Sequence, residues 1–249
     1  MIDLHAHVLP AVDDGPRTLD GSLDILRSMQ SDGVRTVVAT PHVREDWPTS
    51  VELMQREVEA LRAAATRAGV TLEIRTGAEI ALTRLPALRA EERAAFGLGG
   101  NPRLLLLEFP YAGWPVGLED IVFRLRATGV VPLLAHPERN PQVQDDPGRL
   151  GGAVRSGALT QVTAASVDGR LGSSPRKCAR RLVELGLAHV LASDAHAPTV
   201  RAAGLRAAAE SLGPLGVWMT QDVPAALLEG REPPSRPPSH RRRWLRDRR

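Results

Sequence analysis

The stretch HAHVLPAVDDG, residues 5–15, places two histidines and two aspartates directly behind the first predicted strand, residues 1–7. Because side chains alternate between the two faces of a strand, His5 and His7 lie on the same side of it. Imidazole and carboxylate groups this close together are ligands that divalent transition metals accept. The start of the chain therefore predicts a strand that leads into a metal site.

Apolar, β-branched runs alternate with longer amphipathic stretches along the chain. The predicted strands are residues 1–7, 34–41, 70–79, 103–108, 130–136, 159–164, 188–194 and 217–220. The predicted helices are residues 18–32, 51–68, 118–128, 147–156, 175–186, 200–212 and 223–229. Asp20 and Gly33 are expected to begin and end the first helix. Seven or eight such units in 249 residues predict a single-domain α/β barrel of parallel strands. A doubly wound open sheet is the competing fold, but no G-x-G-x-x-G follows the first strand.

Polar residues fall at the ends of these predicted strands, as in VVATPH (37–42), LLLLEF (104–109) and VLASDAH (190–196). Taken alone, each has an ordinary explanation, such as a helix cap or a buried ion pair. In a parallel barrel, however, all these strand ends lie on the face that carries active sites. A buried cluster of imidazoles and carboxylates without a cation would be costly. We therefore expect a metal site that contains His5, His7, Asp14, His42, Glu79, Glu108, His136, Asp194 and His196.

The predicted ligands are nitrogen and oxygen donors without a cysteine, which favours manganese, iron or zinc over a thiolate structural site. They are too many for one ion, and Glu79 and Asp194 are the carboxylates suited to bridge two. Two or three ions about 3.5–4 Å apart are suited to clamp a phosphoryl group, which predicts a phosphate-ester hydrolase. We expect a hydroxide that bridges two metals to attack phosphorus in line. Asp13 is expected to be a turn or capping residue instead of a ligand.

The charge is unevenly distributed. The net charge of the chain is +3, but residues 231–249 hold eight arginines against two acidic residues, which leaves about −3 on the rest. A body of that sign argues against a nucleic-acid partner. The proline- and arginine-rich residues 231–249 are expected to be a disordered basic tail behind a domain of residues 1–230, either solvated or attracted to an anionic lipid or acidic partner.

The compartment is predicted from what the sequence contains. Cys178 is the only cysteine, so no disulfide within the chain can form, and the first residues do not read as a secretion signal. No uncharged apolar run is long enough to cross a bilayer. These features predict a cytoplasmic protein.

The ordered motifs H-x-H, D-D-G, T-P-H, G-x-E, a strand-end glutamate, A-H-P-E-R and S-D-x-H resemble the PHP (polymerase and histidinol phosphatase) superfamily. Within it, the match over residues 1–201 is to the bacterial CpsB/YwqE-type protein-tyrosine phosphatases of capsule and exopolysaccharide synthesis. The resemblance implies a distorted (β/α)7 TIM-like barrel, the PHP fold, with three metals that are usually manganese. By motif, the implied ligands are His5, His7, Glu79 and Asp194 for the first ion, Glu79, Glu108 and His136 for the second, and Asp14, His42 and His196 for the third.

The resemblance also implies roles outside the metal ligands. Arg139 and Arg201 stand at the positions that handle the phosphate in this family. The implied partner is a phosphotyrosine-containing protein, the tail of a bacterial tyrosine kinase. Two departures concern the fit of a phosphotyrosine ring: Asn140 replaces an aromatic residue that often follows H-P-E-R, and Ala197 replaces an asparagine that often follows S-D-x-H.

The sequence fits two other enzyme classes poorly and leaves two alternatives open. A cysteine phosphatase needs C-x5-R, but Glu184 stands where the arginine would be. Two-metal amidohydrolases usually bridge their ions through a carboxylated lysine at a strand end, but the sole lysine, Lys177, falls in a predicted helix. A histidinol-phosphatase-like small-molecule phosphatase stays open as the main alternative. A non-catalytic metal-bound protein that only holds phosphotyrosine is the alternative outside enzymes.

Overall fold

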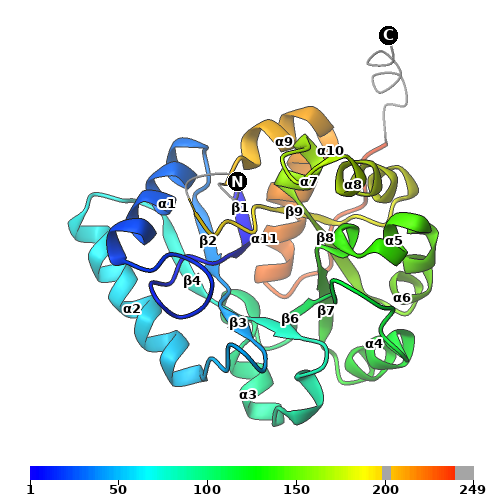
Figure 1. Cartoon of the computed structure of the whole chain (residues 1–249), viewed down its shortest axis with the longest axis horizontal. Coiled ribbons are helices and arrows are strands. Elements are labelled where there is room, and N and C mark those ends of the chain that lie inside the picture. The colour runs from blue at the N-terminus through cyan, green and yellow to red at the C-terminus, as the bar shows by residue number, and fades with distance from the viewer. Residues whose placement is uncertain (198–202, 239–249) are drawn as a thin grey trace.

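The computed structural model describes residues 1–197 and 203–238, and its centre is a ring of short parallel strands (Figure 1). The strands form a three-stranded sheet in the order β1-β2-β4 and a six-stranded sheet in the order β3-β5-β6-β7-β8-β9. Their bounds are β1 Ile2–Ala6, β2 Thr36–Ala39, β3 His42–Val43, β4 Glu73–Thr76, β5 Glu79–Ala81, β6 Leu104–Glu108, β7 Val131–Ala135, β8 Leu159–Thr163 and β9 Val190–Ala192.

The ring closes where the last of these strands returns to the first. Just beyond the end of β9, the amide of Asp194 donates to the carbonyl of His5, and the amide of His7 donates to the carbonyl of Ala195, both at 2.8 Å. These bonds join the two edges that open sheets leave unpaired. The predicted single-domain, distorted TIM-like barrel is confirmed.

Two of the predicted strands are interrupted. The predicted strand 34–41 contains only β2, and β3 starts just beyond it, after Pro41, which has no amide hydrogen to donate to a ladder. The predicted strand 70–79 contains β4, and after a break its last residue, Glu79, begins β5. As a result, His42 and Glu79 begin short strands of their own instead of ending longer ones, and they face each other in the β3–β5 register.

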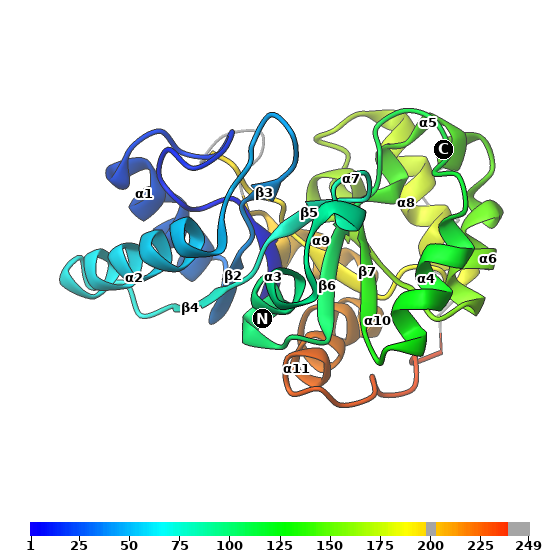
Figure 2. The ribbon, with the colours of Figure 1, turned by 90° about the horizontal axis from the view of Figure 1, so that it is seen from below.

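Helices surround the ring on its outside (Figures 1 and 2). The long helices match predicted ones and are α1 Leu19–Ser31, α2 Val51–Arg67, α4 Leu118–Ala127, α8 Ser173–Leu185 and α9 Leu205–Leu212. Short helices include several that the sequence did not predict and are α3 Ala90–Ala95, α5 Pro141–Asp145, α6 Gly151–Arg155, α7 Ala164–Asp168, α10 Pro214–Val217 and α11 Val223–Leu228. Segments of four to six residues are too short for an apolar period to identify them.

The first helix shows which capping signals the sequence gave correctly. The N-cap of α1 is Thr18, whose hydroxyl accepts a hydrogen bond from the amide of Gly21, so the prediction of Asp20 as its start was wrong. Asp20 lies instead in the first turn, where a negative charge is favourable. Gly33 does follow the end of α1, with a left-handed φ of 87° that a residue with a side chain adopts only at a cost.

The predicted strand 217–220 was wrong. These residues end α10 and enter the π-helical turn Trp218–Asp222 that connects α10 to α11. Leu215, Trp218 and Met219 are buried at helical spacing, whereas Val217 is 48% exposed. The run VWMT is too short to separate a strand from a buried helical turn, and only the flanking residues reveal the longer period.

The two ends of the barrel are covered differently. Figure 2 shows α11 across one end, close to the N-terminus, from which β1 starts. The chain then continues as residues 231–238, where the carbonyl of Pro234 accepts a hydrogen bond from the indole of Trp218 at 2.9 Å. None of the helices in the described part of the chain has the length and apolar character needed to span a membrane.

Candidate metal centre

All nine predicted ligands lie within the described residues, and their side chains come together at one end of the barrel. Eight of them are buried, and the side chain of Asp14 is 41% exposed. Their donor atoms form overlapping groups, each within 4.8 Å, made of His7, Asp14, His42 and His196; His5, Glu79 and His136; His5, His7 and Asp194; and His42, Glu79 and Glu108. Because the groups overlap, the nine side chains form one continuous cluster, which we call the basin.

Glu79, at the start of β5, lies at the centre of this basin. Its Oε2 atom is 3.0 Å from Nδ1 of His42 and 3.3 Å from Nε2 of both His5 and His7. Its Oε1 atom is 2.8 Å from Nε2 of His136. The Oε2 atom is buried and accepts no hydrogen bond, although three imidazoles surround it. One oxygen of this carboxylate thus faces three imidazoles and the other faces a fourth, so Glu79 could serve as a ligand shared by two ions.

The ionisation of Glu79 follows from these neighbours. Burial works against the charged carboxylate, but His5 and His136 outweigh it and hold the pKa of Glu79 well below its usual range. The pKa of His136 is also lowered, to about 4, because its ring is buried and lies near Arg139. A neutral imidazole and an ionised carboxylate are the protonation states that bind a metal.

Asp194, just after β9, is a second shared carboxylate. Its Oδ1 atom is 3.3 Å from Nε2 of His5, 3.5 Å from Nε2 of His7 and 3.6 Å from Nδ1 of His196. Asp194 and His136 both have left-handed backbones, with φ of 51° and 37°. Such a conformation costs roughly 1–3 kcal/mol at a residue other than glycine and is concentrated at functional sites.

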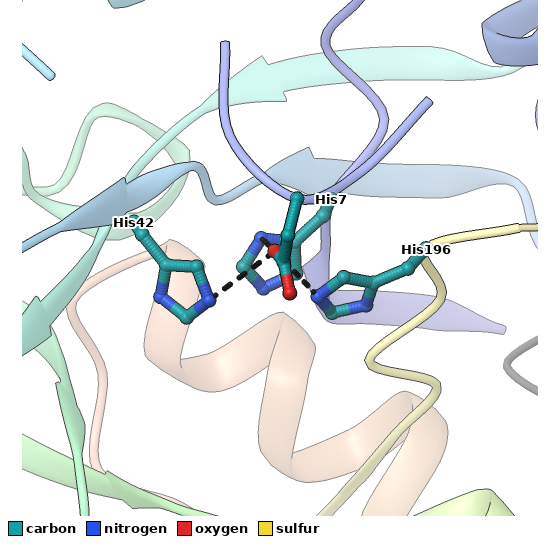
Figure 3. Close-up of side chains that lie close together, drawn as sticks. His7, His42 and His196 are labelled. Atoms are coloured by element: carbon teal, nitrogen blue, oxygen red, sulfur yellow. Dashed lines mark ion pairs between the residues drawn. The ribbon is translucent and has the colours of Figure 1, made fainter. Parts of the chain in front are cut away.

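The outer part of the basin is built around Asp14. Its Oδ1 atom is 3.1 Å from Nε2 of His196 and 3.5 Å from Nε2 of His42. Figure 3 shows His42 and His196 approaching from opposite sides, with His7 between them. The rings of His7 and His196 stack with their centroids 3.9 Å apart. Donors from the first loop, β1, β3 and the segment after β9 therefore meet at the open side of the basin.

The structure groups one set of ligands differently from the family pattern. The resemblance joined Glu108 and His136 around Glu79, but in the structure these two residues fall in separate groups. His136 faces Oε1, whereas Glu108 joins His42 and Glu79 in a group of its own. Glu79 remains the residue that both share.

Residues behind the ligands hold them in place, and the sequence analysis missed these contacts. Nδ1 of His7 donates to Oδ2 of Asp13 at 2.6 Å, and Nδ1 of His5 lies 3.0 Å from Oε1 of Gln161 on β8. Arg44 donates to Oε1 of Glu108 at 3.1 Å. Such outer contacts fix the ring orientation of a metal-binding histidine and tune its basicity. The only sign of this role in the sequence is that Gln161 is a polar residue within the predicted strand 159–164.

Asp13 combines the predicted role with an unforeseen one. Its Oδ1 atom accepts the amide of Gly15, which confirms the turn role. Its Oδ2 atom accepts both His7 and the amide of His42, so one carboxylate ties the first loop to β1 and β3. Burial works against the charged form, but the nearby His7 lowers the pKa of Asp13.

Arg139 lies at the edge of the basin, in the turn after β7. Its Nη2 group donates to Asp194 and, at 3.3 Å, to Thr163, and its Nη1 group donates to the hydroxyl of Tyr111 at 3.3 Å. Its buried Nε has no hydrogen-bond partner in the described part of the chain. Arg201, the other predicted phosphate-binding residue, lies outside the described residues.

A parallel α/β barrel with imidazoles and carboxylates clustered at the carboxyl ends of its strands defines a class of protein with a candidate multi-metal site. Comparison with known proteins narrows the class. The chain belongs to the CpsB/CapC family of capsular polysaccharide synthesis, whose family model matches residues 1–214. The resemblance found in the sequence is thereby confirmed.

Individual relatives agree with this assignment. The chain is 33% identical over 200 residues to the tyrosine-protein phosphatase YwqE of Bacillus subtilis, covering 79% of this chain and 77% of YwqE. It is 32% identical over 206 residues to the tyrosine-protein phosphatase CpsB of Streptococcus pneumoniae, covering 79% and 83%. A chain from the crystal structures of YwqE and CpsB, described as unique metal-dependent tyrosine phosphatases, matches with a TM-score of 0.86 at 28% identity and covers 96% of this chain and 98% of that one.

Proposed function

We propose that this chain is a metal-dependent protein-tyrosine phosphatase. In this proposal, the basin holds two or three divalent ions, with Mn²⁺ as the preferred ion and iron or zinc as alternatives. The ligands would be His5, His7, Asp14, His42, Glu79, Glu108, His136, Asp194 and His196. Membership of a family whose relatives carry the name tyrosine-protein phosphatase supports the choice of reaction.

One observation carries the proposal. Oε2 of Glu79 is fully buried among three imidazole nitrogens at 3.0–3.3 Å and accepts no hydrogen bond. A buried carboxylate normally has its oxygens satisfied, because leaving one without a partner is costly. Cations in the basin would satisfy this oxygen and the nitrogens around it at once.

The chemistry divides between the ions and the protein. When bound, the ions would supply positive charge beside the phosphoryl group and bring the pKa of a water toward neutrality. Arg139 contributes a fixed guanidinium at the rim, where Nε has a hydrogen to donate and Asp194 holds the group in place. An arginine so placed can bind phosphate oxygens and offset charge that develops in the transition state. Arg201 would act with it.

The proposed substrate is the phosphotyrosine-containing tail of a bacterial tyrosine kinase, acted on in the cytoplasm. Phosphotyrosine has a good leaving group, so the proposal requires no dedicated acid. The basic residues 231–249 would help to attract a polyanionic tail or an anionic membrane surface.

The test combines metal analysis with turnover. Protein purified without added metal, then dialysed against Mn²⁺, should retain two or three ions per chain and release phosphate from a phosphotyrosine peptide. Chelation should abolish the release, and Mn²⁺ should restore it. A metal content below one ion per chain, or release that chelation leaves unchanged, would contradict the proposal.

A further inference from the structure

Tyr111, in the loop after β6, is placed at the mouth of the basin. Its ring lies nearly parallel to that of His136, with centroids 5.6 Å apart and an interplanar angle of 16°. Its hydroxyl accepts a hydrogen bond from Arg139 at 3.3 Å. The side chain is nevertheless 47% exposed. One part of the ring is therefore fixed against a predicted metal ligand, while the rest is open to solvent.

The loop that carries Tyr111 is held firmly for a surface segment. The side-chain Nδ2 of Asn140 donates to the carbonyls of Pro110 and Gly113, both at 2.8 Å. Trp114 packs edge to face on Phe109, with centroids 5.7 Å apart. Contacts on both sides of Tyr111 thus determine where its ring stands, without covering it.

Asn140 explains how the chain can lack an aromatic residue after H-P-E-R. Its side chain is 1% exposed and is used fully within the protein, because its oxygen also accepts the amides of Gln142 and Val143 at the start of α5. It therefore cannot contact a substrate. What it does is clamp the loop that presents Tyr111, the only tyrosine in the chain.

We propose that Tyr111 forms the subsite for the aromatic ring of an aryl phosphate, with its exposed face as the stacking surface. This inference rests on the proposed phosphatase function and names the ring contact within it. Arg139 touches both Tyr111 and Asp194, so a phosphoryl group at the basin and a ring at Tyr111 would lie on either side of one guanidinium. Aromatic pairs of this kind add selectivity that a phosphate site alone lacks.

The kinetic test compares a phosphotyrosine peptide with acetyl phosphate, which lacks a ring, in the Mn²⁺-loaded protein. Tyr111→Leu should lower kcat/KM for the peptide roughly 3- to 10-fold, mainly through KM, and leave acetyl phosphate within about twofold. Tyr111→Phe keeps the ring and should keep the peptide activity, although it loses the bond to Arg139. The matched control is Trp47→Leu, a partly exposed aromatic residue in the loop after β3 that makes no ring contact with the described histidine cluster.

The outcomes separate the subsite from the proposed function. Equal loss on both substrates in Tyr111→Leu, no loss on either, or a selective loss only in Trp47→Leu would overturn the subsite. If the native protein hydrolyses neither substrate, the proposed function fails, and binding alone decides the subsite. Protein labelled with 3-fluorotyrosine carries one fluorine position, and in its diamagnetic Zn²⁺-loaded form that signal should shift with phenylphosphonate but not with methylphosphonate. The same response to both phosphonates, or none to either, would overturn the subsite independently of turnover.

Discussion

Charged side chains lie at both ends of the barrel, but the two ends differ in whether these groups have hydrogen-bond partners within the protein. At the amino end, a groove of about 1580 Å³ is lined by the terminal amine, Arg206 and other polar groups. There the amine of Met1 donates to the carbonyl of Gly33, and Arg206 donates through its amide and Nε to Asp32. At the carboxyl end, Oε2 of Glu79 accepts no hydrogen bond among three imidazoles. A buried carboxylate oxygen that accepts no hydrogen bond, in the midst of imidazoles, is thus a better sign of a ligand site than a spacious groove.

The histidines show the same contrast. His189, just before β9 at the amino end, accepts a hydrogen bond from the amide of Thr160 and so joins the segment before β9 to β8. The five histidines at the carboxyl end face one another and the carboxylates around them. Four predictions test whether the two ends differ as described, beginning with the largest expected effect.

The first prediction is that Glu79→Gln abolishes function at the carboxyl end. The substitution removes the negative charge between the imidazoles, so metal content should fall and kcat/KM should drop by more than the roughly 10- to 100-fold that changes around metal ligands cost. Metal analysis and phosphate release measure both effects. Glu210→Gln, an exposed residue of the amino-end groove, is the matched control and should leave both unchanged. Similar losses of metal and activity in the two variants would contradict the prediction that only the carboxyl end binds metal.

The second prediction concerns the support behind the ligands. Asp13→Asn weakens the bond that orients His7 and should lower Mn²⁺ affinity about 10- to 100-fold. Calorimetric titration with Mn²⁺ gives the affinity directly. Asp32→Asn, which changes the acceptor of Arg206 at the amino end, should bind Mn²⁺ like the native protein. An unchanged affinity in Asp13→Asn would mean that His7 needs no outer partner.

The third prediction sharpens the role of His189. Burial, followed by the charge of Arg236, lowers the pKa of His189 from 6.5 to about 4. The unfolded chain therefore binds a proton below pH 6.5 that the folded chain does not, and stability is lost as the pH falls from 6.5 toward 4. Between pH 7.5 and 5.0, this residue should reduce the free energy of unfolding by about 2 kcal/mol. Urea unfolding in the presence of chelator should show a smaller pH dependence in His189→Gln, and an equal dependence would refute the assignment.

The smallest effect is expected from the end of the chain. Removing residues 239–249 should leave the free energy of unfolding unchanged, whereas removing 231–249 also deletes the acceptor for the indole of Trp218 and should cost about 1 kcal/mol. Urea unfolding of the two shortened chains measures the difference. Equal stability would place the boundary of the folded unit at residue 230, as the sequence predicts.

Most of the fold and the site could be predicted because their signals are local. The period-two alternation of His5 and His7, and apolar runs that end in a polar residue, need only neighbouring residues and the rule that parallel strands end on one face. The short strand β3 beyond Pro41 was not predicted, because only Val43 is apolar in the stretch from His42 to Glu45. The missed pairs, such as His5 with Gln161, join residues 156 positions apart, and no local pattern specifies such a partner.

The closure of the ring between β9 and β1 has a consequence for how the protein is made. His5 and His7 leave the ribosome well before Asp194 and His196, which complete their surroundings. A nascent or truncated chain that stops before residue 194 therefore has neither a closed ring nor a full set of donors. The proposed ions would then bind fully only after β9 and the residues behind it have been synthesised. Incomplete products would remain open to proteolysis.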